Sequence, residues 1–180
     1  PYRILWDTMN NVDLANTIAT HDAGSPRDQM VPFWKCVAPR TYMGRGKSTQ
    51  LGYGLGITMG AKLAEPDKLC INVMGDAAIG MVGMDIETAA RSKLGILTIV
   101  LDNGAMAMER ETFPFATEKY GSVYVGGNYR DVAKSLGGWA ERVEKPGEFV
   151  PALKRAIEVT KTGQPALLDC ITKEGFDFSK

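Results

Sequence analysis

Two nearly continuous apolar runs constrain the fold of this chain more than any other feature. They are "LCINVM" at residues 69–74 and "ILTIVL" at residues 96–101, and each is followed by an acidic residue among small turn residues. A strand that is apolar on both faces is typical of a parallel sheet covered by helices. We therefore expect these runs to be two matched strands of such a sheet.

Segments with helical spacing alternate with strand-like runs along the whole chain. Apolar positions from Arg3 to Ala19 roughly fit a helical face, and "TIATHDAG" then predicts a short strand that ends in a turn. Further helices are predicted at 48–64, 83–95, 130–138 and 149–163, further strands at 139–143 and 165–172, and a short helix with an irregular loop at 105–128. This order predicts an α/β fold, a doubly wound parallel sheet with helices on both faces.

The segment "STQLGYGLGITMGAKLA" at 48–64 is unusual for a helix because it carries glycines at 52, 54, 56 and 60. Each glycine weakens an isolated helix by up to about 1 kcal/mol. We therefore expect another part of the molecule to pack closely against it.

Composition limits the class of protein. A chain of 180 residues with 44% hydrophobic residues can bury one core, so we expect residues 1–180 to form a single domain. Lys plus Arg equals Asp plus Glu at 21 each, which argues against nucleic acid or an anionic membrane as the main partner. No apolar run reaches the roughly 18 residues that span a bilayer, and the unpaired spacing of Cys36, Cys70 and Cys170 favours reduced core thiols. We expect a soluble, cytoplasmic protein.

Three turns are expected at the carboxyl ends of strands, where open parallel sheets bind their ligands. They are "HDAGS", "GDAA" and "DNGAMA". Small residues let a ligand approach the backbone, but the charge of Asp76 opposes direct contact with a phosphate. A Mg²⁺ ion between carboxylate and phosphate resolves this conflict, and Asn103 offers a further hard oxygen ligand. Gly-Asp and Asp-Asn-Gly are also ordinary turn sequences, so local spacing alone leaves both interpretations open.

A longer pattern favours the metal site. Gly75-Asp76, a helical segment, a buried strand and Asp102-Asn103 follow one another, and Asn103 lies 27 positions after Asp76. This pattern resembles the thiamine diphosphate signature, Gly-Asp-Gly followed some two dozen residues later by Asn-Asn. Residues from about 17 to 172 look like the diphosphate-binding domain of the acetohydroxyacid synthase, pyruvate oxidase and 2-hydroxyacyl-CoA lyase group.

The resemblance implies a role for each matching residue. Mg²⁺ would be held by the side chains of Asp76 and Asn103 and by the backbone carbonyl of Ala105. The diphosphate would contact Ala23, Gly24, Ser25, Gly75, Ala77 and Ala78. Leu51 would support the thiazolium ring, and the Thr49 carbonyl would contact the aminopyrimidine. Met106 and Ala107 would line the cofactor, and Met108 and Glu109 would lie on the substrate side. The sequence departs from the signature at Ala77, which replaces the second Gly, and at Asp102, which replaces the first Asn.

One element of the family is missing from the expected fold. The glutamate that activates the aminopyrimidine belongs to a separate pyrimidine-binding domain, for which 180 residues leave no room. Either the chain is part of a longer protein, or another polypeptide supplies that acid. The resemblance therefore implies a pyrimidine-binding domain or subunit as an obligate partner and a homo-oligomer of the full enzyme.

The function implied by the resemblance is a component that makes or cleaves a carbon–carbon bond next to a carbonyl of a small-molecule substrate. A 2-keto acid decarboxylase or acetolactate synthase-like carboligase is favoured. A 2-hydroxyacyl-CoA lyase component and a non-catalytic, cofactor-binding regulatory subunit remain alternatives. A nucleotide-binding module is disfavoured because no GxGxxG or GxxxxGK[ST] motif occurs. The only histidine, His21, is interpreted as structural rather than catalytic.

Overall fold

The computed structural model describes residues 1–44, 46 and 50–174 of the chain. Its centre is a six-stranded sheet in the order β2-β1-β3-β4-β6-β5, in which all neighbouring strands are parallel. The strands are β1 (Thr17–His21), β2 (Tyr42–Met43), β3 (Leu69–Gly75), β4 (Ile96–Asp102), β5 (Trp139–Val143) and β6 (Ala166–Ile171). The predicted doubly wound parallel sheet is confirmed. Because the chain winds outward from β1 in both directions, the strand order reverses between β1 and β3.

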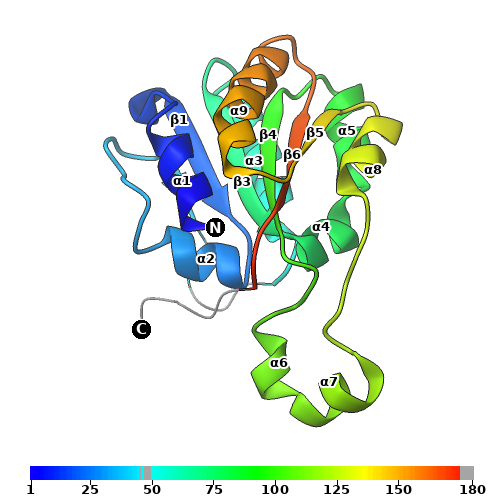
Figure 1. The fold of residues 1–180 in the computed structure, drawn as a ribbon. Coiled ribbons are helices and arrows are strands. Elements are labelled where there is room, and N and C mark those ends of the chain that lie inside the picture. The colour runs from blue at the N-terminus through cyan, green and yellow to red at the C-terminus, as the bar shows by residue number, and fades with distance from the viewer. Residues whose placement is uncertain (45, 47–49, 175–180) are drawn as a thin grey trace.

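Helices cover both faces of the sheet (Figure 1). Helices α1 (Tyr2–Met9), α2 (Ser25–Met30) and α9 (Pro146–Thr160) pack on one face, and α3 (Tyr53–Ala64), α4 (Asp76–Val82), α5 (Asp85–Arg91) and α8 (Tyr129–Ser135) pack on the other. Two more helices, α6 (Glu109–Thr112) and α7 (Pro114–Tyr120), project beyond one end of the sheet. No helix in the described part of the chain is both long and apolar enough to cross a membrane.

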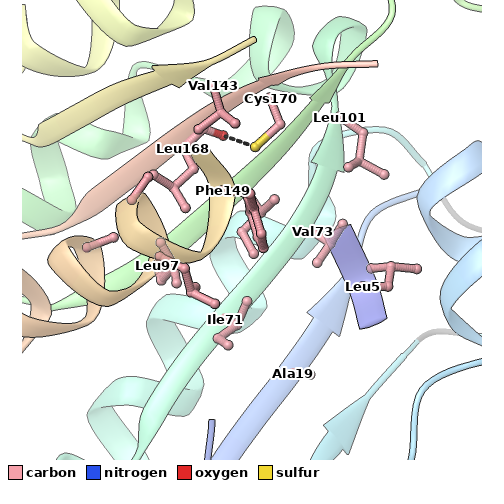
Figure 2. Close-up of a cluster of buried hydrophobic side chains, with 14 of the residues drawn as sticks. Leu5, Ala19, Ile71, Val73, Leu97, Leu101, Val143, Phe149, Leu168 and Cys170 are labelled. Carbon is pink, nitrogen blue, oxygen red and sulfur yellow. Dashed lines mark hydrogen bonds between the residues drawn. The ribbon is translucent and has the colours of Figure 1, made fainter. Parts of the chain in front are cut away.

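The two apolar runs form the centre of the molecule. All seven residues of β4 are buried, and β3 is buried from Cys70 to Met74. Alternate side chains enter opposite cores, so Ile71 joins α1 and α9 while Cys70 joins α3 and α5. Figure 2 shows Phe149 of α9, which is 1% exposed, among side chains of the central strands. Burial of such a side chain stabilises a fold by about 1.5–3 kcal/mol.

The glycine-rich helix packs closely at only one of its interior glycines. A Cβ atom at Gly54 would lie 2.5 Å from Asn72 Oδ1 and 3.0 Å from the carbonyl oxygen of His21. At Gly56 and Gly60 a Cβ atom would meet nothing within 4 Å. The expectation of close packing is therefore correct for the first turn of α3 and wrong for its exposed side.

The N-terminal helix is shorter than predicted. It ends at Met9, because the side chains of Asn10 and Asn11 bond back to the carbonyls of Trp6 and Asp7. A short 3₁₀ turn, Leu14–Asn16, then leads into β1 at Thr17. The apolar positions before Ala19 thus belong to a helix, a turn and a strand, whose mixed spacing imitates one helical face.

Two local predictions need correction outside the sheet. Residues 105–128 contain two short helices, α6 and α7, where the sequence predicted one helix and an irregular loop. Pro114 begins the second of them, at a position where its missing N–H costs nothing. Among the cysteines, Cys70 and Cys170 are buried as expected, but Cys36 is exposed in the connection between α2 and β2. The described residues contain no disulfide, and all three thiols are free.

Candidate functional site

A cavity of about 210 Å³ lies where the ends of β1, β3 and β4 meet. This is the carboxyl edge of the sheet, beside the point at which the strand order reverses, where such sheets bind ligands. All the predicted site residues that the structure describes line this one cavity: Ala23, Gly24, Ser25, Leu51, Gly75, Asp76, Ala77, Ala78, Asn103, Ala105, Met106, Ala107, Met108 and Glu109. The predicted contact at Thr49 lies outside the described residues.

Asp76 is a buried carboxylate in the wall of the cavity. It begins α4 immediately after β3 and is 2% exposed. One oxygen accepts from the amide of Ala77 at 2.7 Å, and the other accepts from the amides of Asn103, Gly104 and Ala105 at 3.1, 2.7 and 3.2 Å. Burial raises its pKa, and these amide hydrogen bonds oppose that rise. Within the described residues it forms no ion pair, so backbone dipoles alone stabilise its charge.

The turn after β4 is shaped around that carboxylate. Gly104 adopts a φ of +74°, which favours glycine, and this lets the amides of residues 103–105 converge on Asp76. The side-chain oxygen of Asn103 accepts from the amide of Ala105 at 3.0 Å. The turn is also tied to the segment that follows α7, through a 2.8 Å bond from the Met106 amide to the Val123 carbonyl. The ends of β3 and β4 therefore form one hydrogen-bonded unit.

The donor set determines which kind of metal the site can hold. Within the described part of the chain, no group of three His, Cys, Asp or Glu side chains is placed to bind a metal ion. Asp76 and the amide oxygen of Asn103 both line the cavity, together with Ala105. One carboxylate with neutral oxygens suits a hard cation such as Mg²⁺ that also binds ligand phosphates, and does not suit zinc.

The turn after β1 contains a functional candidate that sequence reasoning missed. Gly24 has a φ of +79° and ψ of −147°, and the residues that follow it begin α2. Before it lies Asp22, which is fully buried and accepts hydrogen bonds from the amides of Ala23, Gly52 and Gly54. Asp22 does not line the cavity. A signal was present, because Asp22 follows a buried strand and stands beside small residues, as Asp76 does.

His21 lies next to Asp22 but does not line the cavity. It is 1% exposed, and its Nδ1 atom lies 2.9 Å from the Tyr53 hydroxyl. Its ring also packs against Tyr42, with ring centroids 5.7 Å apart. Burial lowers its pKa, which favours the neutral ring. This placement supports the structural interpretation of His21.

The lining of the cavity includes polar residues outside the predicted set. Gln29 lines the cavity and is 2% exposed. Its Oε1 atom has no hydrogen-bond donor among the described residues. Arg27, which pairs with Asp28 at 2.7 Å, and Lys173 also line the cavity. Lys173 follows the end of β6, so its position at the carboxyl edge could have been inferred once the last strand was assigned.

Comparison with known proteins agrees with this geometry. The sequence pattern described as "Thiamine pyrophosphate enzyme, C-terminal TPP binding domain" matches residues 22–170, which include the whole segment from Asp22 to Ala107. The chain belongs to this family. It is thus a thiamine diphosphate-binding domain of the acetolactate synthase-like group, as the resemblance implied.

Individual relatives of the domain carry several names. A probable acetolactate synthase large subunit of Methanococcus aeolicus is 31% identical over 179 residues, which is 94% of this chain and 29% of the relative. A 2-hydroxyacyl-CoA lyase of Oryza sativa subsp. japonica is 30% identical over 140 residues, or 74% of this chain and 24% of the relative. A sulfoacetaldehyde acetyltransferase of Alcaligenes xylosoxydans xylosoxydans is 26% identical over 174 residues, or 92% and 28%. The chain thus spans less than a third of the length of each of these relatives.

Proposed function

We propose that the cavity holds thiamine diphosphate together with Mg²⁺. The observation that carries the proposal is Asp76, a buried carboxylate that faces the cavity and forms no ion pair among the described residues. A buried charge needs a partner, and a divalent cation that bridges carboxylate and diphosphate provides one. Asp76 and Asn103 would bind the metal through side-chain oxygens, and Ala105 through its carbonyl.

The small residues around Asp76 fit the diphosphate. Gly75, Ala77 and Ala78 line the cavity, and a Cβ atom at Gly75 would meet nothing within 4 Å. The same cavity is lined by Ala23 to Ser25, whose side chains are also short. A diphosphate can therefore approach the backbone of both turns. Leu51, half-buried in the same wall, would support the thiazolium ring.

The reaction class follows from the proposed cofactor. When bound, thiamine diphosphate supplies an electron sink for a carbanion next to a carbonyl group. The share of this chain is to anchor the cofactor and to exclude water with Met106, Ala107 and Met108, while Glu109 lies on the substrate side. We infer a lyase or transferase that makes or cleaves a carbon–carbon bond, with a 2-keto acid decarboxylase or acetolactate synthase-like carboligase favoured by the names of several relatives. A 2-hydroxyacyl-CoA lyase is the second candidate, since two relatives carry that name.

A working active site would require more than this chain. We propose that a pyrimidine-binding domain or subunit supplies the activating glutamate and that the complete enzyme is a cytoplasmic homo-oligomer. The short span of the chain relative to its relatives supports this proposal. A non-catalytic, cofactor-binding regulatory subunit is the alternative, and it predicts binding without turnover even when such a partner is present.

Calorimetric titration of the chain with thiamine diphosphate, with Mg²⁺ and then with a chelator, tests the cofactor assignment. We expect saturable binding that requires the metal. Asp76→Ala should abolish the metal-dependent part, while Asp85→Ala, an exposed aspartate on α5 outside the cavity, should leave it unchanged. Binding that ignores Mg²⁺, or equal behaviour of the two variants, would refute the role of Asp76.

The chain can also be used to separate the reaction classes. Supplied with a pyrimidine-binding partner, it should consume a 2-keto acid such as pyruvate and release CO₂. Cleavage of a 2-hydroxyacyl-CoA instead would select the second candidate. Tight binding of cofactor with neither reaction would select the regulatory alternative.

A further inference from the structure

Asp22 connects two cavity-lining segments that are far apart in sequence. Its Oδ1 atom accepts from the amides of Ala23 and Gly52, both at 2.8 Å, and its Oδ2 atom accepts from the amide of Gly54 at 3.0 Å. The first amide belongs to the turn after β1, and the other two belong to the start of α3, some 30 residues later. A single carboxylate therefore fixes the distance between these two segments.

The start of α3 is packed so closely that Gly52 and Gly54 cannot easily be replaced by larger residues. Gly52 has a φ of +96°, and a Cβ atom there would clash with Val82 Cγ1. A Cβ atom at Gly54 would lie 3.0 Å from Asp22 Oδ2 itself. Neither position can therefore carry a side chain unless its neighbours move. Glycine at both positions lets the two amides reach the carboxylate of Asp22.

The residues next to these amides are the ones that line the cavity. Ala23, which donates to Asp22, is followed by Gly24 and Ser25 in the cavity wall, and Gly52 is preceded by Leu51. Asp22 itself is completely buried and outside the wall. It can therefore act on a ligand only by holding these neighbours in place.

We infer that Asp22 is a positioning residue that sets where Leu51 lies relative to the diphosphate turn, by which we mean Ala23 to Ser25 after β1. This inference rests on the proposed function. A ligand that touches both segments, such as thiamine diphosphate, depends on this spacing. A ligand that touches only the diphosphate turn, such as inorganic pyrophosphate, does not. Asp22 thus makes a specific contribution to binding of the thiazolium end.

The test compares two probes, each with Mg²⁺, on the same variant. Asp22→Asn keeps the shape of the side chain and one acceptor oxygen for Ala23 and Gly52, but it places an amide nitrogen against the Gly54 amide. We expect the affinity for thiamine diphosphate to fall about 10-fold, as for loss of a hydrogen bond to a charged group, and the affinity for pyrophosphate to change less than about 2-fold. Equal loss with both probes would overturn the inference.

A matched control separates positioning from general loosening of the fold. Thr160→Val removes a buried hydroxyl that donates to the Ile157 carbonyl at 2.8 Å near the end of α9, outside the cavity. It should lower stability while leaving the ratio of the two affinities unchanged. A shift of that ratio equal to the one in Asp22→Asn would make Asp22 merely structural.

A double-mutant cycle adds a readout that a structural role would not move. Leu51→Ala should weaken thiamine diphosphate binding strongly in the wild-type chain and only weakly in the Asp22→Asn background, because Leu51 is already misplaced there. Additive losses would contradict the coupling. Amide hydrogen exchange of Gly52 and Gly54 in the wild-type chain is an independent check, since both must be strongly protected if Asp22 holds them.

The outcomes also separate this inference from the function on which it rests. If the wild-type chain binds neither probe with Mg²⁺, the proposed function fails and the inference fails with it. If the wild-type chain binds both probes and Asp22→Asn leaves their affinity ratio unchanged, the inference alone fails.

Discussion

The ends of β1 and β3 carry the same chemical device in two different settings. Asp22 and Asp76 each follow a buried strand, each is at most 2% exposed, and each accepts hydrogen bonds from at least three backbone amides. Burial raises the pKa of both carboxyls. They differ in what lies beyond them: Asp76 lines the cavity, and Asp22 does not.

This difference shows that the surroundings of a buried acid decide its role more than its own hydrogen bonds do. A carboxylate enclosed by protein can only organise the backbone, as Asp22 does. A carboxylate at a cavity wall organises the backbone and also offers an oxygen to a ligand. The proposed metal ligand is thus the acid that combines amide hydrogen bonds with access to the cavity.

The largest expected effect is a direct test of the difference between Asp76 and Asp22. Asp76→Ala should remove the enhancement of thiamine diphosphate binding by Mg²⁺, a loss of at least about 1000-fold, or about 4 kcal/mol, because the proposed carboxylate ligand of the metal is gone. Asp22→Asn should bind more weakly but keep its full response to Mg²⁺. Titrations at fixed cofactor with increasing Mg²⁺ measure both responses. A variant of Asp22 that lost its metal response would place the two acids in the same role.

The second effect concerns the fit of α3 against Asp22. Gly54→Ala should lower the free energy of unfolding by about 3 kcal/mol, because the new methyl group would meet Asn72 Oδ1 at 2.5 Å, with Asp22 Oδ2 and the His21 carbonyl both at 3.0 Å. Urea denaturation followed by circular dichroism measures this loss. A stable Gly54→Ala variant would show that the start of α3 moves away from β1 at little cost, and the positioning role of Asp22 would lose its basis.

The sequence predicted the sheet and the cavity well for a physical reason. In a parallel sheet, the ends of neighbouring strands must meet at one edge, so three strand-end turns identify one site without knowledge of side-chain positions. The cavity accordingly gathers Asp76, Asn103 and Ser25 from three separate turns. Small residues such as Ala77 and Ala78 were also predictable, because a backbone that contacts a ligand must be accessible.

Other features depend on contacts that the sequence does not reveal. Asp22 was missed because its partners, Gly52 and Gly54, lie some 30 residues away and bind it only through backbone amides. The first helix was extended past Met9 because turn and strand residues continued its apolar spacing by chance. The second helix at Pro114–Tyr120 was missed because it buries none of its residues and so has no apolar face to detect.

A third buried acid extends the comparison to the pH dependence of stability. Asp169 in β6 is completely buried, and burial together with the nearby Asp102 carboxylate raises its pKa to about 6, although Arg142 pairs with it at 3.1 Å. A raised folded-state pKa means that the protonated acid is favoured by folding. Its stabilising contribution is therefore full below about pH 4, the ordinary range of the group, and is lost as the pH rises through 6.

We therefore expect the wild-type chain to lose roughly 2 kcal/mol of unfolding free energy between pH 4 and pH 7 relative to Asp169→Asn. The difference between the two proteins isolates this group, because Asp22 and Asp76 are present in both. Urea unfolding at several pH values provides the measurement. Parallel pH profiles would mean that Arg142 keeps Asp169 ionised throughout.

The smallest effect tests whether close packing of α3 is confined to the end beside Asp22. Gly56 is exposed, only two residues beyond Gly54, and a Cβ atom there would meet nothing within 4 Å. Gly56→Ala should raise the free energy of unfolding by about 0.5–1 kcal/mol, because alanine loses less backbone entropy in a helix interior. Thiamine diphosphate affinity should stay the same. Destabilisation by Gly56→Ala would mean that the exposed face of α3 also packs against something, and the contrast between the two glycines would then no longer single out the contact with Asp22.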